Sequence, residues 1–313
     1  MPGRTPIVAS LGRFSAMVPL LEAAVPDAEF VAWEAGAPPP EPDVEALVTL
    51  PAGGAPGAEA LTPAIRWVHV LAAGVDGFPL EAVGNRTVTC SRGATAPAIA
   101  EFVLACMLAF EKQLPQSWVH EPPEHWTLAS LGGLRGRTLG LVGVGAIGSE
   151  VAKRALAFEM RVLAHRRTDA PVPVDGVERA ESLPALLRAA DHVVLAAPAT
   201  DSTRRLLDGA AFAAMKPGAH LVNVARGTLV DQDALLAALD DGRLALASLD
   251  VADPEPLPAG HPLYTHPRVR LSPHISWSSP GSLERTIELF ADNVRRWRTG
   301  EQLAGAVDVA AGY

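Results

Sequence analysis

Three glycines, Gly143, Gly145 and Gly148, constrain the fold of this chain more than any other feature. They lie in the stretch LGLVGVGAIGSEVAK, after a nearly continuous apolar run of the kind that forms a strand buried on both faces of a sheet. The residues that follow, 147–158, place apolar side chains at helical spacing. A strand, a glycine turn and a helix in this order are typical of the first unit of a doubly wound α/β fold.

Each glycine of this loop suits a different local requirement. Gly143 can make the tight turn, Gly145 lets a pyrophosphate approach the backbone, and Gly148 permits close packing of helix and strand. The free N–H groups at the start of the helix then face the phosphates. The glycine pattern alone is weak evidence, because a chain with 27 glycines can contain it by chance. Its position between strand and helix favours a dinucleotide-binding loop over a purely structural turn.

The second strand of this unit ends in two arginines. The run MRVLAH is followed by Arg166 and Arg167, with Arg166 18 residues after Gly148, where a fold that binds NAD usually has an acidic side chain. A guanidinium cannot accept hydrogen bonds from ribose hydroxyls, whereas it pairs well with a phosphate. Arg166 and Arg167, with Thr168, therefore favour the 2′-phosphate of NADP; solvated basic residues are the alternative. Asp169 lies too far along the chain to restore the NAD pattern.

The composition indicates a globular protein of two domains. A chain of 313 residues exceeds the size at which a single core usually stops growing, roughly 250 to 300 residues. A net charge of −9 disfavours nucleic acid and anionic membrane surfaces as partners. Two cysteines, Cys90 and Cys106, indicate a reduced, cytoplasmic protein without a metal site. The longest apolar run, residues 98–110, is too short for a membrane span, and we expect no signal peptide.

Short apolar runs alternate with helical patterns along most of the chain. Helices are expected over residues 14–25 and 97–112, and surface turns at the proline-rich residues 36–43 and 51–57. A second series begins at residue 137, with six strand-like runs separated by helical patterns. The sequence therefore predicts two α/β units, the second a doubly wound parallel sheet of six strands. A final helix over residues 283–298 has an apolar face that can pack on the first unit.

An irregular stretch separates the two series. Residues 114–135 carry two tryptophans and four leucines but no regular pattern. Exposed apolar side chains on a long loop often mark contacts with a partner. The alternatives are a loop packed on its own domain and a dimerisation arm.

Three residues after predicted strands have the chemistry for reducing a carbonyl group. Arg226 follows the fourth strand of the second series, Glu255 lies in a proline-rich loop after the fifth, and His274 ends the sixth. Imidazole can protonate the oxygen that gains charge as hydride arrives, and a carboxylate on its second nitrogen fixes the tautomer. A guanidinium can bind a substrate carboxylate and polarise the adjacent carbonyl. Taken singly, each has a structural alternative as a capping, turn or solvated residue.

These segments resemble the D-isomer-specific 2-hydroxyacid dehydrogenase family. The resemblance extends from about residue 68 and rests on LAAGVDG, CSRGATAPAIAEFVLACMLA, LRGRTLGLVGVGAIG, APATDSTRRLL, NVARGTLVD, DVADPEPLP and SPHIS. It implies a Rossmann-type cofactor domain, residues 99–283. It also implies a flavodoxin-like substrate domain built from both chain ends, residues 1–98 and 284–313. Family members are usually dimers through the cofactor domain, which favours the arm interpretation of residues 114–135.

The resemblance also implies the residues of the site. Catalysis falls to Arg226, Glu255 and His274. Substrate-binding residues are Ala73, Gly74, Val75, Arg226, His274 and Trp277, although Trp277 can equally be a core or interface aromatic. Cofactor-binding residues are Gly143, Gly145, Ala146, Ile147, Gly148, His165, Arg166, Arg167, Thr168, Ala197, Pro198, Thr203, Val224, Ala225, Asp250 and Ser276.

The implied activity is the NADPH-dependent reduction of a small 2-oxo acid, such as glyoxylate or hydroxypyruvate, to the D-2-hydroxy acid, with NAD as the alternative cofactor. A 3-phosphoglycerate dehydrogenase is a second possibility, although its substrate needs extra cations near the cleft. A non-enzymatic protein that senses a dinucleotide is a third, and the complete set of Arg226, Glu255 and His274 disfavours it.

Overall fold

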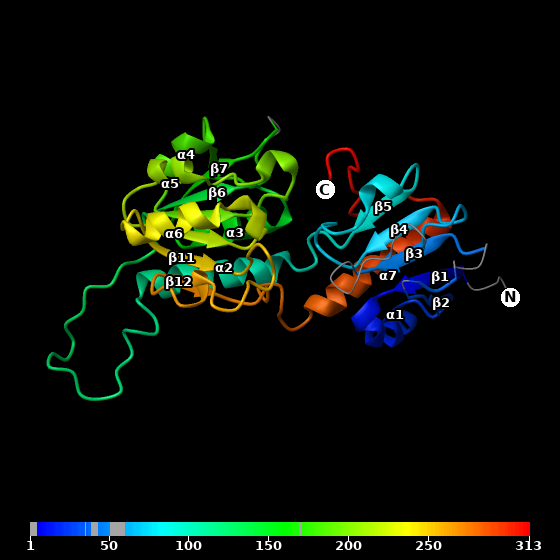
Figure 1. The fold of residues 1–313 in the computed structure, drawn as a ribbon, viewed down its shortest axis with the longest axis horizontal. Coiled ribbons are helices and arrows are strands. Elements are labelled where there is room, and N and C mark those ends of the chain that lie inside the picture. The colour runs from blue at the N-terminus through cyan, green and yellow to red at the C-terminus, as the bar shows by residue number, and fades with distance from the viewer. Residues whose placement is uncertain (1–4, 35, 39–42, 51–59, 169–170) are drawn as a thin grey trace. The chain divides into compact units, whose positions relative to one another are not determined.

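The chain folds into two compact units, each built on a parallel β-sheet flanked by helices (Figure 1). The computed structural model describes residues 5–34, 36–38, 43–50, 60–168 and 171–313. The first unit comprises Met1–Thr95 and Ser279–Tyr313, and the second comprises Ala96–Ser278. Boundaries at residues 98 and 283 would cut two helices near their first residues, whereas this division leaves both helices whole.

Five parallel strands form the sheet in the described part of the first unit, in the order β2-β1-β3-β4-β5. This order is flavodoxin-like, which confirms the predicted fold class. Successive residues of a strand face opposite sides, so Ile7 and Ala9 enter one buried cluster and Val8 the other. The strands are β1 (Thr5–Ser10), β2 (Ala28–Ala32), β3 (Ala46–Thr49), β4 (Trp67–Val70) and β5 (Thr87–Cys90).

Helices α1 (Val18–Ala24) and α7 (Ser282–Thr299) pack on one face of this sheet. From α7, Ile287, Phe290 and Val294 join the same buried cluster as Ile7 of β1. The single helix expected over residues 14–25 is instead a 3₁₀ helix, Gly12–Met17, followed by α1. Pro19 explains where α1 begins, because proline fits the first turn of an α-helix but not its interior. A short 3₁₀ helix, Leu80–Ala82, precedes β5.

Seven parallel strands form the sheet in the described part of the second unit, in the order β12-β11-β10-β9-β6-β7-β8. The prediction of six strands was therefore wrong by one: β8 has three residues and lies at the edge of the sheet, where its polar sequence VER gives no apolar run. The strands are β6 (Thr138–Val142), β7 (Arg161–His165), β8 (Val177–Arg179), β9 (His192–Leu195), β10 (Ala219–Asn223), β11 (Leu244–Leu249) and β12 (Val269–Leu271).

Helices cover both faces of this second sheet, as the doubly wound prediction requires. One buried cluster contains residues of α2 (Ala96–Glu111) and α3 (Ala146–Ala157), and the other contains residues of α4 (Leu183–Ala189), α5 (Gly209–Ala214) and α6 (Gln232–Asp240). Three short 3₁₀ helices, Asp201–Thr203, Gly227–Leu229 and Pro262–Tyr264, lie in the connections.

Asp191, directly before β9, joins separate parts of this unit. Its carboxylate accepts hydrogen bonds from the Thr138 N–H, at 2.8 Å, and from Lys216 Nζ, at 2.9 Å. Burial raises the pKa of Asp191, but these hydrogen bonds and the positive charge of Lys216 outweigh burial and lower the pKa overall.

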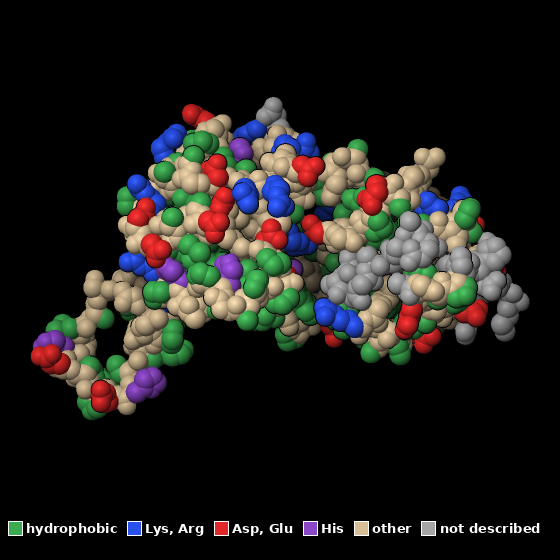
Figure 2. Space-filling model, in the orientation of Figure 1, with side chains coloured by type: hydrophobic (Ala, Val, Ile, Leu, Met, Phe, Trp, Pro, Cys, Tyr) green, Lys and Arg blue, Asp and Glu red, His purple; other side chains and the backbone are tan. Residues whose placement is uncertain are grey.

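Residues 114–135 form a long loop that projects from the second unit (Figure 1). Its base is closed, because Gly132 N–H donates to the Glu111 carbonyl and Lys112 Nζ donates to the Gly132 carbonyl. Figure 2 shows hydrophobic, acidic and histidine side chains along the loop, clear of the body of its unit. The alternative of a loop packed on its own domain is therefore wrong for its large exposed apolar residues, which are Trp118, Val119, Trp126, Leu128 and Leu131.

The turns expected at residues 51–57 lie outside the described residues, as do residues 39–42 of the turn expected at residues 36–43. In the described part of the chain, no helix is long and apolar enough to cross a membrane.

Candidate active site

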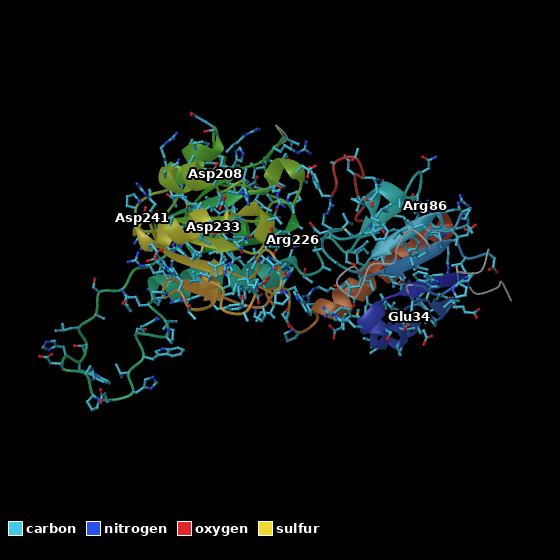
Figure 3. All side chains as sticks on the ribbon, in the orientation of Figure 1. Glu34, Arg86, Asp208, Arg226, Asp233 and Asp241 are labelled. Carbon is cyan, nitrogen blue, oxygen red and sulfur yellow. The ribbon has the colours of Figure 1, made fainter. Side chains whose placement is uncertain are left out.

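The predicted catalytic and cofactor residues of the second unit follow the carboxyl ends of its strands. In an open α/β sheet these ends form the crevice in which ligands bind. Figure 3 shows Arg226, which follows β10, and Asp241, which precedes β11, at opposite ends of the unit. Arg226 therefore marks the carboxyl edge of the sheet.

The glycine loop after β6 has the shape that a pyrophosphate needs. Gly143 has a φ of +95°, and a Cβ there would lie 2.7 Å from both the Ala196 carbonyl oxygen and the Ala197 nitrogen. A Cβ on Gly148 would lie 2.3 Å from the Gly143 carbonyl oxygen, whereas one on Gly145 would meet nothing within 4 Å. Two glycines thus permit close backbone packing, and the third leaves space in front of the helix.

Helix α3 begins directly behind this space. Ala146 and Ile147 lie in its first turn, and among the described residues no side chain caps the helix N-terminus. Its first N–H groups are therefore available to an anionic group, as binding of a dinucleotide phosphate requires. The residues present fit a dinucleotide cofactor.

The end of β7 is rich in cations. His165 is the last residue of the strand, and Arg166 donates from its guanidinium to the Pro171 carbonyl at 2.7 Å. Burial lowers the pKa of His165, and so does the positive charge of Arg179, which ends the neighbouring strand β8. Arg179 was not among the predicted residues, because β8 itself was missed. Asp169 lies outside the described residues.

The loop after β9 contains Ala197, Pro198 and Thr203. The Thr203 hydroxyl oxygen accepts from the Thr200 N–H at 2.8 Å and donates to the Pro198 carbonyl at 2.7 Å. This hydroxyl therefore shapes the loop that the sequence assigned to cofactor binding.

Arg226 is held by the side chain of Asn223, the last residue of β10. The Asn223 amide accepts from the Ala225 N–H and donates to the Arg226 carbonyl, both at 3.0 Å. Arg226 itself donates to the Ala225 carbonyl at 2.7 Å. The buried Asn223 amide thus fixes the backbone from which the predicted catalytic guanidinium extends. Val224 and Ala225 lie between the two residues and are buried.

Gly227 brings the next loop into direct backbone contact. A Cβ on Gly227 would lie 2.0 Å from the Ala252 carbonyl carbon and 2.5 Å from the Asp253 nitrogen. Only glycine permits this approach, so the segment carrying Arg226 packs against the loop carrying Glu255.

Glu255 and His274 form the hydrogen-bonded pair that the sequence predicted. His274 Nδ1 lies 2.8 Å from Glu255 Oε2, and Glu255 Oε1 accepts from the Ala252 N–H at 3.0 Å. Burial raises the pKa of Glu255, but the hydrogen bonds from His274 and Ala252, with the charge of Arg226, outweigh burial and lower the pKa overall. The carboxylate therefore stays ionised and keeps His274 Nε2 as the outward nitrogen.

Asp250 holds the loop that carries His274. Its side chain is buried and accepts from Ser272 Oγ at 2.6 Å, from the Ile275 N–H at 2.9 Å and from the Ser276 N–H at 2.8 Å. The Asp250 carbonyl also accepts from the His274 N–H at 2.9 Å. These contacts hold His274 at a φ of +55°, a conformation that non-glycine residues seldom adopt.

Trp277 contributes to the same loop. Its indole nitrogen donates to the His274 carbonyl at 2.9 Å, and the residue is 45% exposed. The interpretation of Trp277 as a core aromatic is therefore wrong, and its place in a substrate pocket stays a prediction.

The segment Ala73, Gly74 and Val75 lies in the first unit, after β4. Val75 is buried, while Ala73 and Gly74 are half-buried, and the Ala73 carbonyl accepts from Cys90 Sγ at 3.6 Å. Its role in binding a substrate carboxylate stays a prediction.

Comparison with known proteins identifies the family. Residues 104–276 match the NAD-binding domain of D-isomer specific 2-hydroxyacid dehydrogenases. The chain is 38% identical over 243 residues to the (S)-sulfolactate dehydrogenase of Chromohalobacter salexigens, covering 75% of this chain and 78% of that protein. It is 35% identical over 273 residues to the glyoxylate reductase of Thermococcus gammatolerans, covering 83% of this chain and 81% of that protein.

A solved structure is similar over nearly the whole length of the chain. The crystal structure of a D-isomer specific 2-hydroxyacid dehydrogenase from Xanthobacter autotrophicus Py2, in complex with NADPH and MES, is similar with a TM-score of 0.84. The two chains are 28% identical, and the comparison covers 99% of this chain and 100% of that one.

The fold and these matches define a nicotinamide-dependent oxidoreductase with a Rossmann cofactor domain. The chain belongs to the D-isomer specific 2-hydroxyacid dehydrogenase family, and its activity is that of an NAD(P)-dependent 2-hydroxyacid dehydrogenase.

Proposed function

We propose that this enzyme reduces a small 2-oxo acid, of the glyoxylate or hydroxypyruvate type, to the D-2-hydroxy acid with NADPH. The observation that carries the proposal is the Glu255–His274 pair at the carboxyl edge of the sheet, next to the loop of Arg226. The glyoxylate reductase activity named for the Thermococcus relative supports the substrate class.

Each residue of the set has one role in this proposal. The bound cofactor supplies hydride to the carbonyl carbon. Arg226 binds the substrate carboxylate and polarises the carbonyl, because a guanidinium offers paired donors to one planar anion. His274 donates a proton from Nε2 to the carbonyl oxygen, and Glu255 stabilises the ring through Nδ1. The family resemblance also supports a role for the backbone of Ala73, Gly74 and Val75 in binding substrate.

The preference for NADPH rests on the cations after β7. Arg166 and Arg167, with Thr168, occupy the position where an acidic residue would favour NAD, and Arg179 adds a positive charge beside His165. The NADPH bound in the Xanthobacter structure supports this assignment. The remaining predicted cofactor residues would hold the pyrophosphate and the nicotinamide end.

The same proposal includes a cytoplasmic homodimer formed through the cofactor domain and the loop of residues 114–135. Its support is the exposed apolar surface of that loop, which includes Trp118 at 64%, Trp126 at 68% and Leu128 at 75%. Apolar side chains this exposed on a projecting loop are typical of protein–protein contacts.

A substrate panel tests the proposed function. The oxidation of NADPH and of NADH is followed with glyoxylate, hydroxypyruvate, 3-phosphohydroxypyruvate and 3-sulfopyruvate. The proposal predicts the highest kcat/KM for glyoxylate or hydroxypyruvate with NADPH. A higher kcat/KM for 3-sulfopyruvate would instead indicate a sulfolactate dehydrogenase, the activity named for the Chromohalobacter relative. Turnover with none of the four acids would refute the proposal.

A further inference from the structure

Gln232 contacts the loop of Glu255 through its side chain. It is the first residue of α6, and its amide Nε2 donates to the Asp253 carbonyl at 2.6 Å. Its Oε1 accepts from the Asp253 N–H at 3.2 Å. One side-chain amide therefore binds both backbone polar groups of Asp253, as a neighbouring strand would.

Helix α6 does not require this arrangement for its own stability. The N-terminal cap is already provided by Asp231, whose carboxylate accepts from the Ala234 N–H at 3.1 Å. This cap satisfies one of the free N–H groups of the first turn, whereas the Gln232 side chain binds Asp253. Its contacts are instead directed at the Asp253 backbone.

The Asp253 backbone lies within the segment that orients Glu255. Ala252 N–H donates to Glu255 Oε1, and Glu255 Oε2 binds His274 Nδ1. Gly227 packs against the Ala252–Asp253 peptide without space for a Cβ. Van der Waals contact with Gly227 limits how closely this peptide approaches, and the two Gln232 hydrogen bonds oppose its movement away from α6.

We propose that Gln232 is a positioning residue for the reaction: it holds the Ala252–Glu255 loop so that the Glu255 carboxylate binds the His274 ring in the productive orientation. This inference rests on the proposed function, because it takes His274 as the proton donor. A loop displaced by about 1 Å can reduce turnover on the order of 10²-fold.

The first test removes both hydrogen bonds. Gln232→Met keeps a side chain of similar length without a strong donor or acceptor. We expect kcat to fall about tenfold or more, with KM for NADPH changed by no more than about twofold, because Gln232 acts on the proton-transfer side of the site. Gln302→Met is the matched control, since Gln302 is exposed in the other unit, and it should leave kcat unchanged.

The second test uses pH. In Gln232→Glu a neutral carboxyl group can still donate to the Asp253 carbonyl and accept from the Asp253 N–H, whereas the ionised group can only accept. The kcat of Gln232→Glu relative to wild type should therefore fall as the pH rises from about 4.5 to about 8, since a glutamate titrates near pH 4.3. The same ratio for Gln232→Met should stay constant. A merely structural role for Gln232 predicts a ratio independent of pH for Gln232→Glu as well.

A third readout is independent of turnover. We expect the His274 Nδ1–H that binds Glu255 to give a downfield proton resonance in the cofactor-free enzyme, which its loss in His274→Gln would assign. Gln232→Met should shift or broaden it, and Gln302→Met should not. An unchanged resonance, or a kcat for Gln232→Met within about twofold of wild type, would overturn the inference. Wild-type enzyme without activity on any 2-oxo acid would instead overturn the proposed function, and the resonance would still test the positioning.

Discussion

Gly227→Ala tests whether backbone contact between the Arg226 and Glu255 loops matters for turnover. The added Cβ would lie 2.0 Å from the Ala252 carbonyl carbon, and ordinary contact begins at 3.4 Å. The Ala252–Asp253 peptide must therefore move by about 1.4 Å, as judged from these two distances. Because the Ala252 N–H binds Glu255 Oε1, the carboxylate moves with it and no longer aligns the His274 ring.

A displacement of this size predicts a fall in kcat on the order of 10²-fold and a loss of stability of about 1–3 kcal/mol. Steady-state kinetics with NADPH and a urea melt measure the two effects. Gly209→Ala is the matched control, because a Cβ there meets nothing within 4 Å; it should leave kcat unchanged and raise the stability by about 1 kcal/mol at most. If Gly227→Ala is folded and its kcat lies within about threefold of wild type, the loop contact does not position the pair and the reasoning is refuted.

Three further predictions follow from other parts of the chain. Arg166→Ser with Arg167→Ser should raise KM for NADPH about 10- to 100-fold and change KM for NADH little, because only NADPH carries a 2′-phosphate; an unchanged ratio of the two contradicts the assignment. Asp191→Asn should lower the free energy of unfolding at pH 7 by about 1 kcal/mol. The folded-state pKa of Asp191 lies below its unfolded-state pKa. The difference in free energy of unfolding between wild type and Asp191→Asn should therefore be constant above about pH 4 and shrink as the pH falls through the folded-state pKa. Urea melts at each pH measure this difference. Trp126→Glu with Leu128→Glu should convert a dimer to a monomer in light scattering, and an unchanged mass would exclude this loop from the interface.

The sequence predicted those parts of the fold that have a local signature. Buried parallel strands are runs of apolar residues, and five of the seven strands in the second sheet have such a run, whereas Arg270 interrupts the run of β12. The glycines at 143, 145 and 148 could be recognised from the sequence, because only glycine fits the close backbone contacts found at Gly143 and Gly148. The strand β8 has neither signature and was missed.

The positioning residues of the site have no such signature. Asn223, Gln232 and Asp250 each bind, through side-chain atoms, backbone groups of a loop that carries a predicted catalytic residue, in two cases across 21 or more residues of sequence. Their residue types are common at strand ends and in first helical turns, so nothing local distinguishes them. Asp250 was predicted as a cofactor-binding residue through the family resemblance, and a search for polar side chains at each predicted strand end would also have found Asn223. Finding Gln232 requires the position of α6 against the loop.

The most direct test of the proposed mechanism is the kcat of His274→Ala for glyoxylate with NADPH, measured together with the Kd for NADPH by fluorescence. If His274 supplies the proton, kcat should fall about 10²- to 10⁴-fold while Kd stays within about twofold of wild type. A kcat within about tenfold of wild type, or an equal loss of turnover and cofactor affinity, would contradict the assignment of His274 as the proton donor.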